Sequence, residues 1–287
     1  MSNTNDIIRY GIFDGERAFY GSHGVTVERC NFDGEADGES AFKESCDVTA
    51  NECYFNLRYP FWHTSGIRLL ECKMTDCCRA PLWYSENIDV SYCGILGVKA
   101  LRECSDARFD FCDIVSAEFG WFSRDVHLNG CKVKSEYFML HAKDLTVCST
   151  ELYESKYSFQ YVENATVENC TLSTKDAFWH AKNVTVRNCT VRGEYLGWYS
   201  ENLTFENCTL IGTQPLCYCK GLKLIDCTME DADLAFERSY VDAEIDSRVI
   251  SIKNAYGGKI RVRGADTVIR DDENALCVIE INEDGNG

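Results

Sequence analysis

The sequence predicts an all-β protein: a single-stranded right-handed parallel β-helix (a solenoid) of about 11–12 coils, with a repeat of about 19–20 residues. The first observation is an internal repeat marked by one recurring cysteine. The second is the alternation of apolar and polar residues before that cysteine, which is typical of a strand with one buried face. The third is the length of the repeat, which holds short strands and bends but no helix of ordinary length.

The recurring cysteine defines the repeat. Four segments align around it: ENATVENCTL (163–172), KNVTVRNCTV (182–191), ENLTFENCTL (201–210) and KGLKLIDCTM (220–229). Their cysteines are 19 residues apart, and eleven copies extend back to Cys30. Ten of the eleven carry cysteine, because Thr150 stands at this position once. Equivalent positions of stacked coils lie about 4.8 Å apart, so each position forms a ladder along the solenoid.

Each repeat contains two apolar segments separated by a bend. Val184 and Val186 lie five and three residues before the cysteine, and Val191 lies two residues after it. The alternation predicts a strand, and the change of phase at the cysteine predicts a bend. An aromatic pair such as Phe178-Trp179 marks the second segment.

Domain organisation follows from where the repeat is regular. We expect a single domain over residues 1–287, with regular coils over about 12–240. The repeat decays after that, and the segment 241–287 is expected to form a C-terminal cap, since an uncovered terminal strand would pair with another molecule.

Two other repeat folds fit the sequence less well. A leucine-rich repeat shares the spacing of Val184, Val186, Cys189 and Val191, but it needs a further leucine where this chain has Ala181. A pentapeptide-type quadrilateral helix fits worse, because apolar residues do not recur every five positions.

Composition limits the classes of partner. The chain has 29 basic and 46 acidic residues, a net charge of −17, which repels phosphate backbones and anionic lipid. We therefore expect neither a nucleic acid nor a membrane as partner, and no apolar run is long enough to span a bilayer. The N-terminus has no basic stretch followed by an apolar core, so we expect a cytoplasmic location with the 18 cysteines kept as thiols.

The cysteine ladder is interpreted as interior packing, because cysteine is a small and frequently buried residue. No C-x-x-C is present, so no metal site and no cofactor are expected. The Asn-x-Thr triplets are interpreted as bends, since asparagine tolerates left-handed backbone. They begin at Asn164, Asn183, Asn188, Asn202 and Asn207.

Aromatic residues gather in two neighbouring columns. All five tryptophans stand ten residues before the recurring cysteine, and we call this position the tryptophan column. Its tryptophans are Trp62, Trp83, Trp121, Trp179 and Trp198. The next position, the ring column, includes Tyr84, His180 and Tyr199. Both columns mix aromatic with polar residues, which indicates exposed ladders, and they are the candidate substrate-binding residues.

A charged strip lies three to four residues before the tryptophan column. It supplies the candidate catalytic residues Glu118, Glu136, Asp176, Glu194, Arg79 and Lys99, together with Arg102 of the tryptophan column itself. Acids on successive coils could lie about 5 Å apart, the separation of a retaining glycosidase. A lysine or arginine could instead act as the base of a polysaccharide lyase.

Two functions stay open at this point. Rings beside charges are how proteins hold oligo- or polysaccharides, which would make this a carbohydrate-binding or carbohydrate-processing protein. Aromatic stacks also stabilise parallel solenoids without binding anything. The alternative is a non-catalytic structural or protein-interaction scaffold, including an acidic mimic of DNA.

Several segments carry a resemblance to a known family. They are GERAFY (15–20), YPFW (59–62), RAPLWY (79–84), KDAFWH (175–180) and GEYLGWYS (193–200). In order and spacing they resemble an uncharacterised bacterial single-domain family of the pectate-lyase-like right-handed β-helix superfamily. The resemblance implies the fold; the family has no established activity, so the link to polysaccharides is analogy only.

Overall fold

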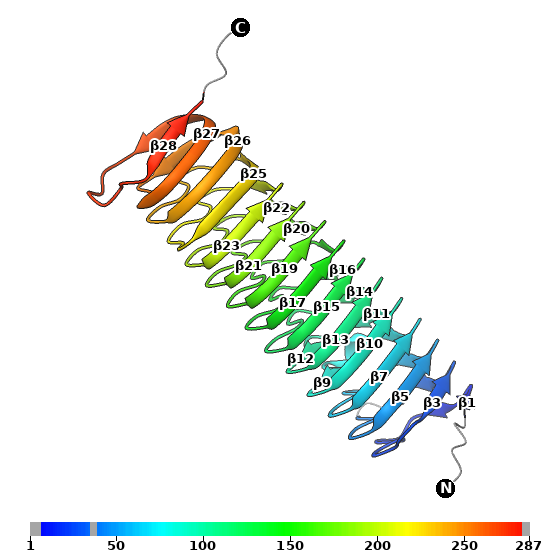
Figure 1. Cartoon of the computed structure of the whole chain (residues 1–287). Helices are drawn as coiled ribbons and strands as arrows, with labels where there is room; N and C mark the ends of the chain where they lie inside the picture. The colour runs from blue at the N-terminus through cyan, green and yellow to red at the C-terminus, as the bar shows by residue number, and fades with distance from the viewer. Residues whose placement is uncertain (1–6, 35–38, 283–287) are drawn as a thin grey trace. The chain divides into compact units, whose positions relative to one another are not determined.

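The computed structural model describes residues 7–34 and 39–282. Two compact units divide the chain, residues 1–143 and 144–287. Each unit is a parallel β-solenoid, and together they hold about 14 turns with a repeat of about 19 residues (Figure 1). The all-β solenoid is confirmed, with a few more turns than expected; its right-handed winding stays a prediction. Within the described ranges, the one helical element is the short 3-10 turn η1 (Asp76–Cys78).

Unit 1 has two parallel ladders. The main ladder consists of β1 (Ile7–Arg9), β3 (Thr26–Glu28), β5 (Cys46–Asn51), β7 (Ser65–Leu70), β10 (Glu86–Ser91), β13 (Ser105–Asp110) and β15 (Arg124–Asn129). The second consists of β2 (Ile12–Phe13), β4 (Asn31–Phe32), β6 (Tyr54–Phe55), β8 (Lys73–Met74), β11 (Gly94–Leu96), β14 (Asp113–Val115) and β16 (Lys132–Lys134). A further short pair joins β9 (Leu82–Trp83) to β12 (Leu101–Arg102).

Unit 2 repeats the arrangement, and β17 (Lys143–Cys148) begins at the last residue of unit 1. Its main ladder continues with β19 (Glu163–Glu168), β21 (Lys182–Arg187), β23 (Glu201–Glu206), β25 (Leu222–Glu230), β26 (Tyr240–Lys253), β27 (Gly257–Ile269) and β28 (Val278–Ile281). The second ladder has β18 (Glu151–Leu152), β20 (Thr171–Ser173), β22 (Thr190–Arg192) and β24 (Thr209–Ile211).

In the segment expected to form a C-terminal cap, the described residues continue the parallel ladder. Strand β26 pairs with β25, β27 with β26, and β28 with β27, all in parallel. Both β26 and β27 are long, with 14 and 13 residues, so one continuous strand replaces the two short strands of a regular coil. These extra turns raise the count above the number expected from the cysteine repeat.

Left-handed backbone makes the bends. A regular coil has five such positions, for example Asp176 (φ 51°), Phe178 (62°), His180 (54°), Asn183 (53°) and Asn188 (52°). Among the residues that the structure describes, no valine, isoleucine or threonine has positive φ, because a branched Cβ crowds this conformation. The interpretation of the Asn-x-Thr triplets as bends is therefore confirmed.

The interior is built from the predicted apolar columns. Val184, Val186 and Val191 are fully buried. Phe159 and Phe178 of adjacent coils are also fully buried, and their rings stack at 4.9 Å. The recurring cysteines lie inside as free thiols and turn their S–H groups to backbone carbonyls. Each large ring removed from water contributes about 1.5–3 kcal/mol, so this core stabilises every coil. No helix in the described ranges is long and apolar enough to cross a membrane.

Candidate functional site

The tryptophan column of unit 1 contains stacked rings and cations that lie over ring faces. Trp62 and Trp83 stack at 5.9 Å with 16° between their planes. The ammonium of Lys43 lies 4.3 Å from the centre of the Trp62 ring, and the guanidinium of Arg102 lies 5.2 Å from the Trp121 ring. The Trp62 ring is therefore contacted by a neighbouring ring and by a cation, and the Trp121 ring by a cation, which is attracted to the electron-rich face.

In unit 2 the tryptophan column is tied to the backbone as well. Trp179 and Trp198 stack at 5.4 Å with 3° between planes. The Nε1–H of Trp179 donates to the carbonyl of Tyr195 at 2.6 Å, and that of Trp198 donates to the carbonyl of Gln214 at 2.7 Å. Each indole thus joins its coil to the following one through a hydrogen bond.

The ring column is more exposed, but its rings also stack face to face. In unit 2, His180 lies 4.8 Å from Tyr161 and 5.0 Å from Tyr199, and Tyr199 lies 4.8 Å from Tyr218, all within 11° of parallel. In unit 1, Tyr84 stacks on a histidine of the preceding coil in the same way. The column consequently presents ring edges to solvent, whereas a sugar stacks on a ring face.

In unit 1, three of the five predicted catalytic residues lie together, and Arg102 of the tryptophan column is one of them. The Oε2 atom of Glu118 lies 3.7 Å from Nζ of Lys99 and 3.6 Å from Nη1 of Arg102. Arg102 also donates to Glu103 at 3.2 Å. The fourth residue, Arg79, is exposed. Arg102 is thus engaged by two carboxylates and a ring, the pattern of a structural ion network. The remaining predicted acid of this unit, Glu136, is half-buried.

The charged strip of unit 2 contains a buried carboxyl. Asp176 is 8% exposed, and its Oδ1 has no hydrogen-bond partner among the described residues. Burial raises the pKa of Asp176, while the nearby Lys175 partly opposes this. Glu194 on the next coil is exposed and pairs with Lys175 at 3.2 Å. Asp176 and Glu194 do lie on adjacent coils, because the backbone N–H of Asp176 donates to the carbonyl of Glu194.

A polar groove of about 780 Å³ lies over the main ladder of unit 1, and it was not predicted. Its lining includes His23, Asp47 and Arg68. Gly24 and Gly66 stand six residues before the recurring cysteine, where most other coils carry Asn or Asp, and the missing side chains leave room there. The sequence feature that could have predicted the groove is His23, which stands seven residues before the recurring cysteine, outside the aromatic columns.

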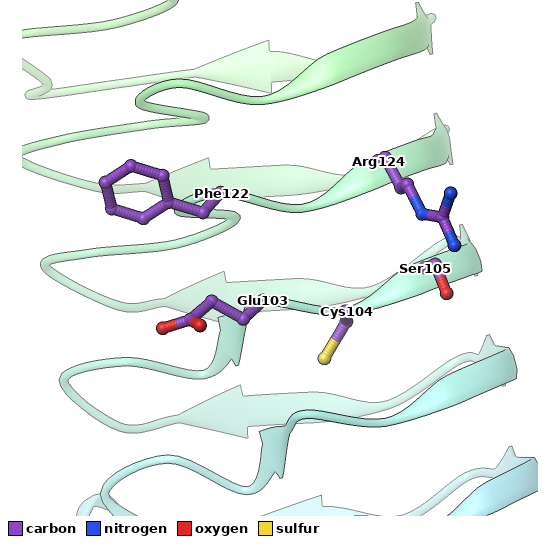
Figure 2. A pocket seen from close by; sticks show the side chains of 5 residues that line it. All are labelled: Glu103, Cys104, Ser105, Phe122 and Arg124. Atoms are coloured by element: carbon purple, nitrogen blue, oxygen red, sulfur yellow. The ribbon is translucent and has the colours of Figure 1, made fainter.

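A second hollow, of about 480 Å³, is open and shallow (Figure 2). Glu103, Cys104 and Ser105 line it from one coil, and Phe122 and Arg124 from the next. Its thiol is unsuited to catalysis, because burial raises the pKa of Cys104 to about 12 and its S–H turns to a backbone carbonyl. The hollow offers no activated nucleophile.

The fold and its surface ladders define a parallel β-solenoid whose candidate sites all lie on exposed faces of stacked coils. The chain belongs to the family described as protein of unknown function (DUF3737), whose profile matches residues 6–281. No curated protein matches the sequence. The placement in the pectate-lyase-like superfamily stays a prediction.

Among solved structures, the chain is similar to a pentapeptide repeat protein involved in heterocyst differentiation regulation from the cyanobacterium Nostoc sp. The identity is 12%, the similarity covers 78% of this chain and 92% of that one, and the TM-score is 0.30. A similarity of this size carries no argument about function.

Proposed function

We propose that this chain is a non-catalytic interaction scaffold, in which the aromatic columns stiffen the stacked coils and the exposed faces receive a partner protein. The observation that supports the proposal is the face-to-face stacking of the rings, from 4.8 to 5.0 Å in the ring column of unit 2. A ring covered on both faces contributes to stability, and only its edge is open to a ligand.

The charged strip fits the same function. Glu118 is neutralised by Lys99 and Arg102, and Glu194 by Lys175. These ion pairs connect charged side chains of neighbouring coils. Such pairs between coils relieve the repulsion expected in a chain of net charge −17.

The test is a calorimetric screen of the full chain against neutral and uronate-containing oligosaccharides, together with assays for reducing ends and for unsaturated products. A scaffold gives neither heat of binding nor product. The proposal is overturned if an oligosaccharide binds and if Trp179→Ala weakens that binding at least tenfold. A matched control is Tyr240→Ala, which removes an exposed ring of unit 2 outside both columns.

Carbohydrate processing is the second candidate function, and the buried Asp176 favours it. A carboxyl with a raised pKa, such as that of Asp176, can donate a proton to the glycosidic oxygen of the leaving group. A neighbouring carboxylate such as Glu194 would then either activate a water molecule or attack the sugar carbon as the nucleophile. The test is hydrolysis of the oligosaccharide panel by wild type, Asp176→Asn and Glu194→Gln, with Glu201→Gln as an exposed control on the same unit. A product that all three variants still release would exclude this pair of carboxyls.

A further inference from the structure

We propose that His23, Cys46 and Asp47 form a binding site for a divalent transition metal, zinc in particular, on the first coils of unit 1. One ligand atom from each of the three side chains lies within 4.8 Å of the other two. Nε2 of His23 and Oδ2 of Asp47 are 3.6 Å apart. Imidazole nitrogen, thiolate sulfur and carboxylate oxygen are the donors that zinc takes in proteins.

The separations suit tetrahedral coordination. Ligand distances of about 2.0–2.3 Å place two ligand atoms of a tetrahedral zinc about 3.3–3.7 Å apart. The histidine–aspartate separation already falls in this range, so a small rotation of the Cys46 side chain completes the set. Three protein ligands leave a fourth position open to water or to a group from another molecule.

The stacking of coils builds the site. His23 and Cys46 form a parallel bridge, so they occupy the same column of adjacent coils. Backbone hydrogen bonds on both sides of His23 fix this register: Cys46 donates to the carbonyl of Ser22, and Gly24 donates to the carbonyl of Cys46, both at 3.0 Å. The ligands are therefore positioned by the ladder and need no loop to close around the metal.

Glycine provides room for the carboxylate. Asp47 has left-handed backbone (φ 54°), and its Oδ1 lies where a Cβ on Gly66 of the next coil would come within 2.9 Å. Any larger residue at Gly66 would displace the Asp47 carboxylate. The open fourth position borders the polar groove, because His23 and Asp47 both line it.

The same unit contains a comparison pair. Nε2 of His127 lies 3.1 Å from Oδ1 of Asp125. In that coil the position equivalent to Cys46, seven residues before the recurring cysteine, is Arg124. This pair lacks a thiol and serves as a control for a histidine–carboxylate contact alone. Cys77 is the control for an exposed thiol alone.

The experiment is titration of the full chain with Co²⁺, followed by the thiolate-to-metal charge-transfer band and the ligand-field bands of tetrahedral cobalt, with displacement by Zn²⁺. Wild type is expected to bind one equivalent. Cys46→Ser and His23→Asn should lose the band or weaken binding at least tenfold, and Asp47→Asn should weaken it while keeping a residue that tolerates left-handed backbone. Cys77→Ser and His127→Asn should titrate like wild type.

A second measurement uses wild type alone, so that a misfolded variant cannot obscure the answer. Alkylation of each cysteine is followed by mass spectrometry with and without Zn²⁺. Zinc should slow alkylation of Cys46 at least tenfold and leave Cys77 unchanged. Absence of a cobalt band in wild type, a band that persists in Cys46→Ser, or equal alkylation of Cys46 with and without zinc would overturn the proposal.

Discussion

Asparagine at the bends contributes through both its backbone and its side chain. Asn183 adopts φ 53° and donates from Nδ2 to Oδ1 of Asn164 at 3.1 Å, while its own Oδ1 accepts from Asn202 at 3.0 Å. A second ladder runs through Asn188 in the same manner. The side chains that a glycosylation motif would expose are thus occupied by one another.

We predict that Asn183→Ala destabilises the chain by about 2 kcal/mol, because it places a Cβ-bearing residue without a side-chain hydrogen bond in left-handed backbone and breaks two ladder bonds. Asn183→Gly should cost less, since glycine adopts this conformation freely. Urea denaturation checks both, with Thr185→Ala on the same strand as control. An alanine variant as stable as the glycine variant would contradict the argument.

Asp176 makes stability depend on pH in a definite direction. Its folded-state pKa is raised above the ordinary value of 3.8, so the folded state binds the proton more tightly. The carboxyl therefore favours folding below its ordinary pKa, and that contribution is lost as the pH rises through the folded-state pKa. At neutral pH the buried charged form is destabilising.

We predict that Asp176→Asn stabilises the chain at neutral pH by about 1 kcal/mol, the lower end of the cost of an unsatisfied buried polar atom. The advantage over wild type should shrink as the pH approaches about 4. Thermal unfolding across this range, with Glu201→Gln as control, measures it. A stability difference that stays constant with pH would show that the carboxyl is not desolvated.

At the scale of the element, the tryptophan column connects adjacent coils through ring stacking and hydrogen bonds. The Trp198 ring is half-buried, stacks on Trp179 and donates a hydrogen bond to the carbonyl of Gln214. These two contributions can be separated by substitution, because phenylalanine keeps a ring but has no donor.

We predict that Trp198→Phe costs about 1 kcal/mol, the net value of one hydrogen bond, and that Trp198→Ala costs about 3 kcal/mol. Chemical denaturation gives both values, and the exposed Tyr240→Ala provides the control. If the alanine and phenylalanine variants were equally stable, the ring itself would contribute nothing to the stack.

The strands and their buried faces could be predicted because they are local patterns. Val184 and Val186 alternate with polar residues, and the cysteine marks one bend in each of ten coils. The orientation of the rings could not be predicted. The repeat gives the spacing between rings of a column, but it does not give the side-chain χ angles that place the rings face to face. Strand β26 lacks the cysteine and still alternates between buried and exposed residues, so its coil shows in the alternation and not in the cysteine column.

The group of His23, Cys46 and Asp47 was missed for a different reason. His23 and Cys46 each stand seven residues before a recurring cysteine, so the repeat places them in one column, but it does not show how close their side-chain atoms come. The structure brings one ligand atom of each of the three side chains within 4.8 Å of the others.

At the scale of the whole molecule, stability within each unit is a sum over neighbouring coils, because a solenoid has few contacts between distant coils. Phe178 is fully buried and contacts Phe159 on one side and Phe205 on the other. A cavity at this position should weaken its own coil and the adjacent ones first.

We predict that Phe178→Ala lowers the global stability by about 3–4 kcal/mol and raises hydrogen exchange most strongly in β19, β21 and β23. The increase should fall off along unit 2 toward β27. Hydrogen–deuterium exchange with mass spectrometry resolves this profile. A uniform rise across unit 2 would mean that the coils unfold only as a single cooperative block.

The regular repeat of unit 2 also determines which insertions and deletions the chain can tolerate. Residues 163–181, 182–200 and 201–219 place asparagine, cysteine and small interior residues at the same points of three successive coils. Gain or loss of one whole repeat would leave every ladder with a suitable neighbour. A single-residue insertion would put a branched side chain into a left-handed bend and a polar one into the core. Tolerance to insertion is therefore periodic in this molecule, and gene duplication in units of a repeat is the route by which such a chain can grow.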